Sequence, residues 1–114
     1  MKVSVEDRQG LFKSLRVEVE GDIVRSALDE VYNYLKENAE VEGFRRGKAP
    51  LWIIKAKFKD YIKEEVGKKV ANATLASAIQ ESVLRPVADI FLEEVDFQES
   101  DQKVSYSVSF EVPP

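Results

Sequence analysis

Both ends of the chain alternate between apolar and polar side chains, which is the pattern of half-buried β-strands. Residues 2–6 and 15–20 alternate in this way and are separated by a glycine-containing turn. Residues 95–97 and 104–112 repeat the pattern at the other end, and a polar turn lies between them. The alternation therefore predicts one β-hairpin at each end of the chain.

The middle of the chain repeats its apolar residues with the period of an α-helix. The spacing predicts a helix over residues 23–39, a short helix over residues 51–58 and a long helix over residues 61–84. Asp22 and Asp60 precede the first and the third of these helices. Both are suitable N-cap residues, because a carboxylate can accept a hydrogen bond from a free backbone N–H.

The order of these elements predicts an α+β fold. Two terminal hairpins would form an antiparallel sheet, and helices would pack on one of its faces. A helix of about 17 residues reaches roughly 25 Å, so the loop after the first long helix would lie at the tip of a helix-loop-helix arm. Gly67 permits close packing against a neighbouring element. Residues 1–114 are expected to form a single domain.

Three aromatic residues in the helical region are interpreted as packing residues. Tyr32 and Tyr34 could stack on bases, but a role in the core or at its boundary is favoured. Trp52, the only tryptophan, is interpreted as a packing anchor of the short helix. This interpretation leaves the loop between the first two helices as the candidate functional segment.

Charge is distributed unevenly along the chain. The whole chain has 17 basic and 21 acidic residues, a net charge of −4. Residues 43–59 contain six basic residues and no acidic one, so the remainder carries a net charge of −10. This asymmetry predicts a docking surface for an anionic partner. Just before it, Glu37, Glu40 and Glu42 either balance the basic loop or form an ordinary solvated face.

The loop itself, residues 43–50, reads Gly-Phe-Arg-Arg-Gly-Lys-Ala-Pro. Its two glycines can adopt positive φ and turn the chain sharply. Its phenylalanine either folds back onto the helices or meets a partner, and its arginines suit carboxylates and phosphates. The candidate binding residues are therefore consecutive: Gly43, Phe44, Arg45, Arg46, Gly47 and Lys48.

This loop resembles the signature Gly-Phe-Arg-x-Gly-Lys-x-Pro of trigger factor, the bacterial ribosome-associated chaperone family. Residues 3–6 and 106–112 also resemble the family, so the resemblance covers essentially the whole chain, as an amino-terminal domain. It implies ribosome docking at the polypeptide exit tunnel, where the loop contacts a ribosomal protein and adjacent rRNA of the large subunit. Phe44, Arg45 and Arg46 match the family's ribosome-contacting triplet, in which lysine often stands where this chain has Arg46.

The resemblance also implies functions that lie outside residues 1–114. Peptidyl-prolyl cis-trans isomerase activity would reside in a following domain, and nascent polypeptides would bind to a carboxy-terminal domain. The 114 residues are therefore expected not to be an enzyme. A stand-alone RNA-binding domain is the alternative, although the acidic remainder of the chain argues against it. A homodimer formed through apolar surface stays open.

Several chemistries are excluded by composition. The chain has no cysteine and no histidine, which removes disulfides, thiolate chemistry and the Ser-His-Asp arrangement. No metal-ligand spacing is present, and no cofactor is expected. Only three residues separate Gly43 from Gly47, and Ala49 follows Lys48, so the loop is not a nucleotide-binding P-loop. No segment is apolar enough for a membrane span or a signal peptide, and a cytoplasmic protein is the simplest expectation.

Overall fold

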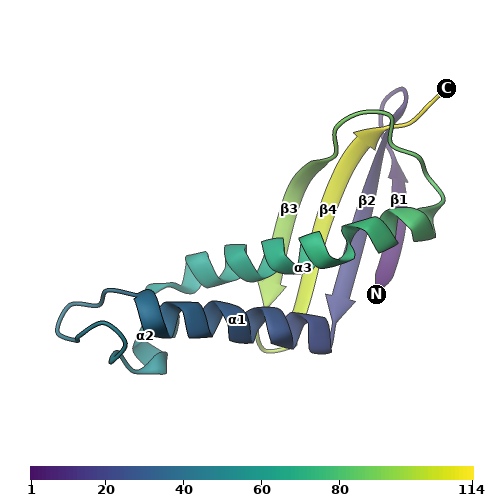
Figure 1. Ribbon diagram of the computed structural model, residues 1–114. Coiled ribbons are helices and arrows are strands. Elements are labelled where there is room, and N and C mark those ends of the chain that lie inside the picture. The colour runs from purple at the N-terminus through teal and green to yellow at the C-terminus, as the bar shows by residue number, and fades with distance from the viewer.

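The computed structural model describes residues 1–114, which form four strands and three helices (Figure 1). The elements in chain order are β1 (Lys2–Asp7), β2 (Phe12–Glu20), α1 (Asp22–Asn38), α2 (Leu51–Lys57), α3 (Lys59–Ser82), β3 (Phe91–Gln98) and β4 (Lys103–Glu111). The predicted order and the predicted α+β class are both confirmed. None of the helices combines the length and apolarity needed to cross a lipid bilayer.

The two terminal hairpins join through their long strands into one antiparallel sheet with the order β1-β2-β4-β3. In the central pair of strands, Leu15 lies opposite Val108 and Val17 lies opposite Tyr106. All four side chains are at most 1% exposed. Because successive side chains of a strand point to opposite faces, these apolar pairs define the face on which the helices pack.

Helix α3 crosses this face, and α1 lies alongside α3 (Figure 1). The helical stripe predicted for α1 is buried, and so is the first half of the stripe in α3. Strand and helix residues together form one cluster of 21 buried residues, so the two hairpins and the helices share a single core. Tyr32 belongs to this cluster as expected, whereas Tyr34 is 56% exposed, so the expected role in the core or at its boundary is wrong for Tyr34.

Helix α3 approaches the edge strand β3 closely at one point. A Cβ atom built on Gly67 would overlap Cγ1 of Val95. The absence of a side chain at Gly67 therefore sets the distance between α3 and β3. The prediction that Gly67 serves close packing is confirmed.

Neither of the predicted N-cap residues caps its helix. Helix α1 already begins at Asp22, and Gly21 occupies the cap position with a φ of 91°. Helix α3 begins before Asp60, because a single residue, Phe58, separates it from α2. Phe58 has φ −111° and ψ 27°, so there is no extended residue here of the kind that a side-chain cap requires.

The molecule is elongated, with principal extents of 58 × 23 × 17 Å. Its radius of gyration is 16.8 Å, whereas a compact domain of this length would have about 13 Å. The difference comes from the arm formed by α1, α2 and the start of α3, which projects beyond the sheet (Figure 1). The predicted helix-loop-helix arm is therefore present.

Candidate functional site

The basic loop lies at the end of the arm that is farthest from the sheet (Figure 1). Helix α1 ends where the backbone N–H of Ala39 donates to the carbonyl of Leu35 at 2.8 Å and Ala39 turns to an extended conformation. Pro50, with φ −62° and ψ 149°, directs the chain into α2. Helices thus fix both ends of the loop and leave its middle in solvent.

Two tight turns shape the middle of the loop. The N–H of Phe44 donates to the carbonyl of Val41 at 3.0 Å, and the N–H of Lys48 donates to the carbonyl of Arg45 at 2.9 Å. Gly43 and Gly47 adopt φ values of 89° and 83°. A side chain at either position would be strained in this left-handed region, so both glycines have the role that the sequence predicts.

The side chains between the two glycines are exposed. Phe44 is 41% exposed, so the chain covers part of its ring and leaves part of it free to meet a partner. Nη2 of Arg46 lies 2.6 Å from Oε1 of Glu40, whereas Glu37 and Glu42 form no ion pair. Of the acidic residues before the loop, Glu40 alone therefore balances its charge.

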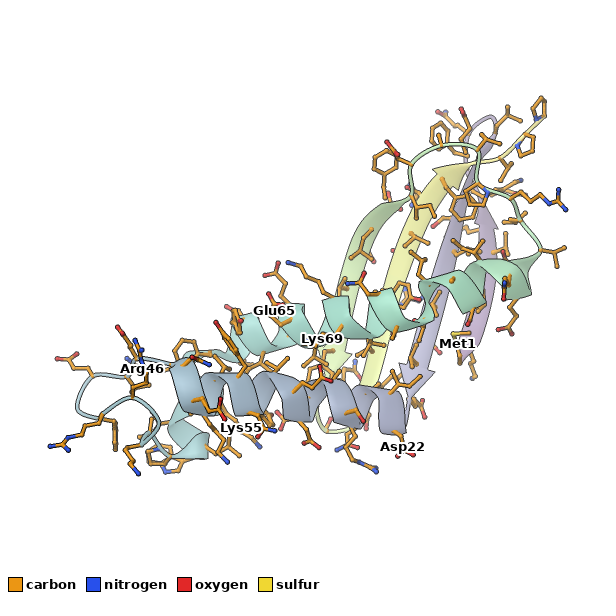
Figure 2. The ribbon with its side chains drawn as sticks, viewed as in Figure 1. Met1, Asp22, Arg46, Lys55, Glu65 and Lys69 are labelled. Atoms are coloured by element: carbon orange, nitrogen blue, oxygen red, sulfur yellow. The ribbon has the colours of Figure 1, made fainter.

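The six cations of residues 43–59 divide into a paired set and an unpaired set. Arg46 is paired with Glu40, and Lys55 is paired with Glu99 at 3.1 Å. Figure 2 shows Arg46 and Lys55 together at the arm, on the opposite side of the molecule from Met1. The remaining four cations of residues 43–59 have no acidic partner within ion-pair distance: Arg45, Lys48, Lys57 and Lys59.

Trp52 does not pack in the core, and its interpretation as a packing anchor is wrong. Its side chain is 71% exposed, whereas Ile54 in the same short helix is fully buried. Residues two positions apart in an α-helix are separated by roughly 200° around its axis. Because Ile54 faces the core, Trp52 faces solvent. One turn of helix fixes that direction, and the composition of the segment did not show which of its apolar residues would be buried.

A polar cluster at the base of the arm joins three elements, and we call Tyr32, Lys55 and Glu99 the arm-base cluster. The hydroxyl of Tyr32 donates to Oε1 of Glu99 at 2.8 Å, and Nζ of Lys55 lies 3.1 Å from the same oxygen. Nζ of Lys55 also lies 5.1 Å from the centre of the Tyr32 ring. The cluster links α1 and α2 to the turn between β3 and β4, so it fixes the arm relative to the sheet.

The surroundings of this cluster shift two pKa values. Burial raises the pKa of the Tyr32 hydroxyl, and its hydrogen bond to the Glu99 carboxylate raises it further. Burial opposes ionisation of Glu99, but the hydrogen bonds from Tyr32 and Lys55 prevail and hold its pKa below the ordinary value. The sequence could not reveal the cluster, because its members are far apart in the chain and follow no local pattern.

No group of three or more acidic side chains converges in a way that could hold a metal ion. The largest hollow, of about 610 Å³, lies open between α1 and α3, and Lys69 and Glu30 at its rim are paired with each other at 3.2 Å. Surfaces that could meet a partner include the exposed tip of the arm and the apolar residues at the far end of the sheet.

Comparison with known proteins assigns the chain to a family. A family model described as "Bacterial trigger factor protein (TF)" matches residues 1–114. The chain belongs to the trigger factor family. The trigger factor of Aquifex aeolicus (strain VF5) is 56% identical over 104 residues, which are 91% of this chain and 22% of that relative. The trigger factor of Vesicomyosocius okutanii subsp. Calyptogena okutanii (strain HA) is 33% identical over 114 residues, 100% of this chain and 26% of that relative.

The fold is also that of a trigger factor. A solved structure described as "Promiscuous Substrate Recognition in Folding and Assembly Activities of the Trigger Factor Chaperone" matches with a TM-score of 0.71 at 18% identity. The match covers 100% of this chain and 27% of that one. The chain thus spans about a quarter of the length of the trigger factors that it matches.

Proposed function

We propose that this chain is the ribosome-docking domain of a trigger factor chaperone. One observation carries the proposal. In a chain of this family, the complete Gly-Phe-Arg-x-Gly-Lys-x-Pro loop stands exposed at the tip of an arm. Its partner would be the large ribosomal subunit near the polypeptide exit tunnel, where rRNA supplies the negative charge that the basic tip complements.

Each loop residue has a distinct role in this proposal. Phe44 would be an apolar anchor against a ribosomal protein, since its exposed ring gains burial only from a partner. Arg45 has no acidic partner and is free to pair with a carboxylate or an rRNA phosphate. Arg46 would exchange Glu40 for the ribosome. Gly43 and Gly47 preserve the turns, and Lys48 adds long-range attraction.

The proposal extends to a full-length protein, because the chain spans only about a quarter of the length of the trigger factors that it matches. The related solved structure is described in terms of promiscuous substrate recognition in the folding and assembly activities of the trigger factor chaperone. We infer that docking brings such substrate binding close to nascent polypeptides in the cytoplasm. Prolyl isomerase activity would lie in a domain outside residues 1–114, and these residues would contribute binding alone.

Co-sedimentation with purified bacterial ribosomes tests the docking function. The parent chain is compared with the triple variant Phe44→Ala, Arg45→Ala, Arg46→Ala. A matched control is Phe91→Ala, Arg85→Ala, Lys2→Ala, which also removes one exposed aromatic ring and two cations, all distant from the tip. Circular dichroism checks that all three chains are folded.

We expect the parent and the control to pellet with ribosomes and the loop variant to stay in the supernatant. Added salt should release the bound chains. Equal pelleting of the loop variant would show that the loop is not the determinant. Binding to protein-free rRNA as tight as binding to whole ribosomes would instead favour a general RNA-binding domain.

A further inference from the structure

Trp52 lies just outside the signature loop, in the first turn of α2. Among the large apolar side chains only Val83 is more exposed. Ala56 follows Trp52 by one helical turn on the same face, is itself exposed and is too small to cover the indole. Most of the indole is therefore apolar surface that the folded chain leaves uncovered and that a partner could bury.

The charge around Trp52 has one sign. No acidic residue occurs between residues 43 and 59, and three cations of this segment, Lys48, Lys57 and Lys59, form no ion pair. Lys55 is the exception, because Glu99 holds it in the arm-base cluster. An exposed aromatic face and unpaired cations on one short segment are the combination with which proteins bind single-stranded nucleic acid.

We propose that Trp52 stacks on an unpaired base of RNA while Lys48, Lys57 and Lys59 pair with phosphates along the same strand. The inference rests on the proposed function, because rRNA at the docking site is the RNA that the tip would meet. It gives the tip two contacts. The loop binds with Phe44 and the arginines, and the start of α2 binds a base with Trp52.

The charge of the surface favours RNA over an apolar protein pocket. A protein pocket for Trp52 would have to be lined by apolar groups and also accommodate three unpaired lysines. A stacked base requires only the face of the ring, and its phosphates supply the partners that the lysines lack. One nucleic-acid segment thus satisfies the indole and the cations together.

The first test uses the indole itself, since Trp52 is the only tryptophan in the chain. Its fluorescence is followed while the chain is titrated with a short, unstructured single-stranded RNA at low salt. Stacking should quench the emission in a saturable manner, and added salt should reverse the quenching. Emission that stays unchanged while an independent assay shows the RNA bound would overturn the proposal.

The second test separates stacking from simple burial. Ribosome co-sedimentation is measured for Trp52→Ala, which removes the ring, for Trp52→Leu, which keeps apolar volume, and for Trp52→Tyr, which keeps an aromatic face. Stacking is worth about 1–3 kcal/mol per base, so the Ala and Leu variants should bind about 5- to 150-fold more weakly. The Tyr variant should keep most of the affinity, and Phe91→Ala, an exposed ring far from the tip, should bind as the parent does.

Each outcome decides between the two proposals. Failure of the parent to co-sediment would overturn the docking function and this inference with it. A parent that binds, with Trp52→Ala binding equally well, would overturn this inference and leave docking intact. Affinity restored by Trp52→Leu as well as by Trp52→Tyr would show that the indole fills an apolar protein pocket, and stacking would then be wrong.

Discussion

Val83 ends α3 in the left-handed region of backbone conformation, with φ 63° and ψ 9°. Its N–H donates to the carbonyl of Gln80 at 3.2 Å, which closes the last turn of the helix. Glycine is the usual residue in this conformation, because a Cβ atom costs about 1–2 kcal/mol there. The side chain is 85% exposed, so it recovers little of that cost through packing.

Replacing Val83 by glycine should therefore stabilise the protein. The relief of strain exceeds the added flexibility of the unfolded chain, and we expect a net gain of about 0.5–1 kcal/mol. This corresponds to a rise in Tm of roughly 2–5 °C. Val83→Ala, which keeps the Cβ atom, is the control and should gain less. A glycine variant that melts at or below the parent's Tm would contradict this account of the helix end.

At the scale of whole elements, Gly67 sets the distance between α3 and β3. Gly67→Ala would favour the helix by about 1 kcal/mol through propensity, but its methyl group would overlap Val95. Overpacking of this kind costs about 1–3 kcal/mol, so the variant should be less stable than the parent in urea unfolding. Propensity and packing thus oppose each other at one residue.

A double-mutant cycle tests whether Val95 causes the loss. Shortening Val95 to alanine removes the methyl group that Gly67→Ala would overlap. In the Val95→Ala background, we expect Gly67→Ala to be neutral or stabilising. An equal loss in both backgrounds would show that the cost of Gly67→Ala arises elsewhere in the helix.

The arm-base cluster should make the attachment of the arm depend on pH. The folded state holds the pKa of Glu99 below its ordinary value, which is about 4.3 for a glutamate in an unfolded chain. The stabilisation is therefore fully present above that value and is lost as the pH falls through the folded pKa. Because Glu99 is 49% exposed, solvent screening limits the effect to about 1 kcal/mol.

Thermal unfolding of Glu99→Gln checks this expectation. The variant should melt below the parent near pH 7, and the difference should disappear as the pH falls through the folded pKa of Glu99, where the parent's carboxylate becomes protonated as well. Glu81→Gln is the control, because Glu81 is exposed and forms no ion pair. A difference in Tm that persists unchanged at low pH would mean that charge at Glu99 does not stabilise the arm.

The strands and helices were predicted well from the sequence. Each buries its regularly spaced apolar residues, so the spacing of apolar residues along the chain shows the type of element. The β4 alternation and the α1 stripe are examples, and both are buried as expected. In short elements, the sequence did not show whether a single side chain points to the core or to solvent. Helix α2 has only seven residues, too few for the spacing of its apolar residues to show which side is buried. The exposure of Trp52 depends on which side of this short helix meets the core.

The loop was predicted from residue types and the family resemblance, and its glycines have the expected backbone conformations. Its ion pairs were not predictable in the same way. Glu40 was one of three equivalent candidates, and only the folded chain shows that it is the one that pairs with Arg46. Contacts such as that between Lys55 and Glu99 depend on tertiary structure, which no short window of sequence contains.

At the scale of the whole molecule, shape and charge act together. The molecule is 58 Å long, and the arm carries the segment of residues 43–59, with six cations and no acidic residue. The remainder has a net charge of −10. An anionic surface therefore attracts one end of the molecule and repels the other, and this orients the chain before contact. Screening over about 8 Å at physiological salt leaves the tip as the part that an rRNA surface attracts.

The salt dependence of ribosome binding tests this picture, with Lys57→Gln, Lys59→Gln as the tip variant. If both lysines contact phosphates, removing them should lower the slope of log K against log salt by about one to two units. The control is Lys68→Gln, Lys69→Gln, which changes the net charge equally on α3, where both lysines are paired with glutamates at 3.0 and 3.2 Å. An equal change in slope for the two variants would mean that net charge, rather than the unpaired cations of the tip, governs docking. A change confined to the tip variant would place phosphate contacts at Lys57 and Lys59.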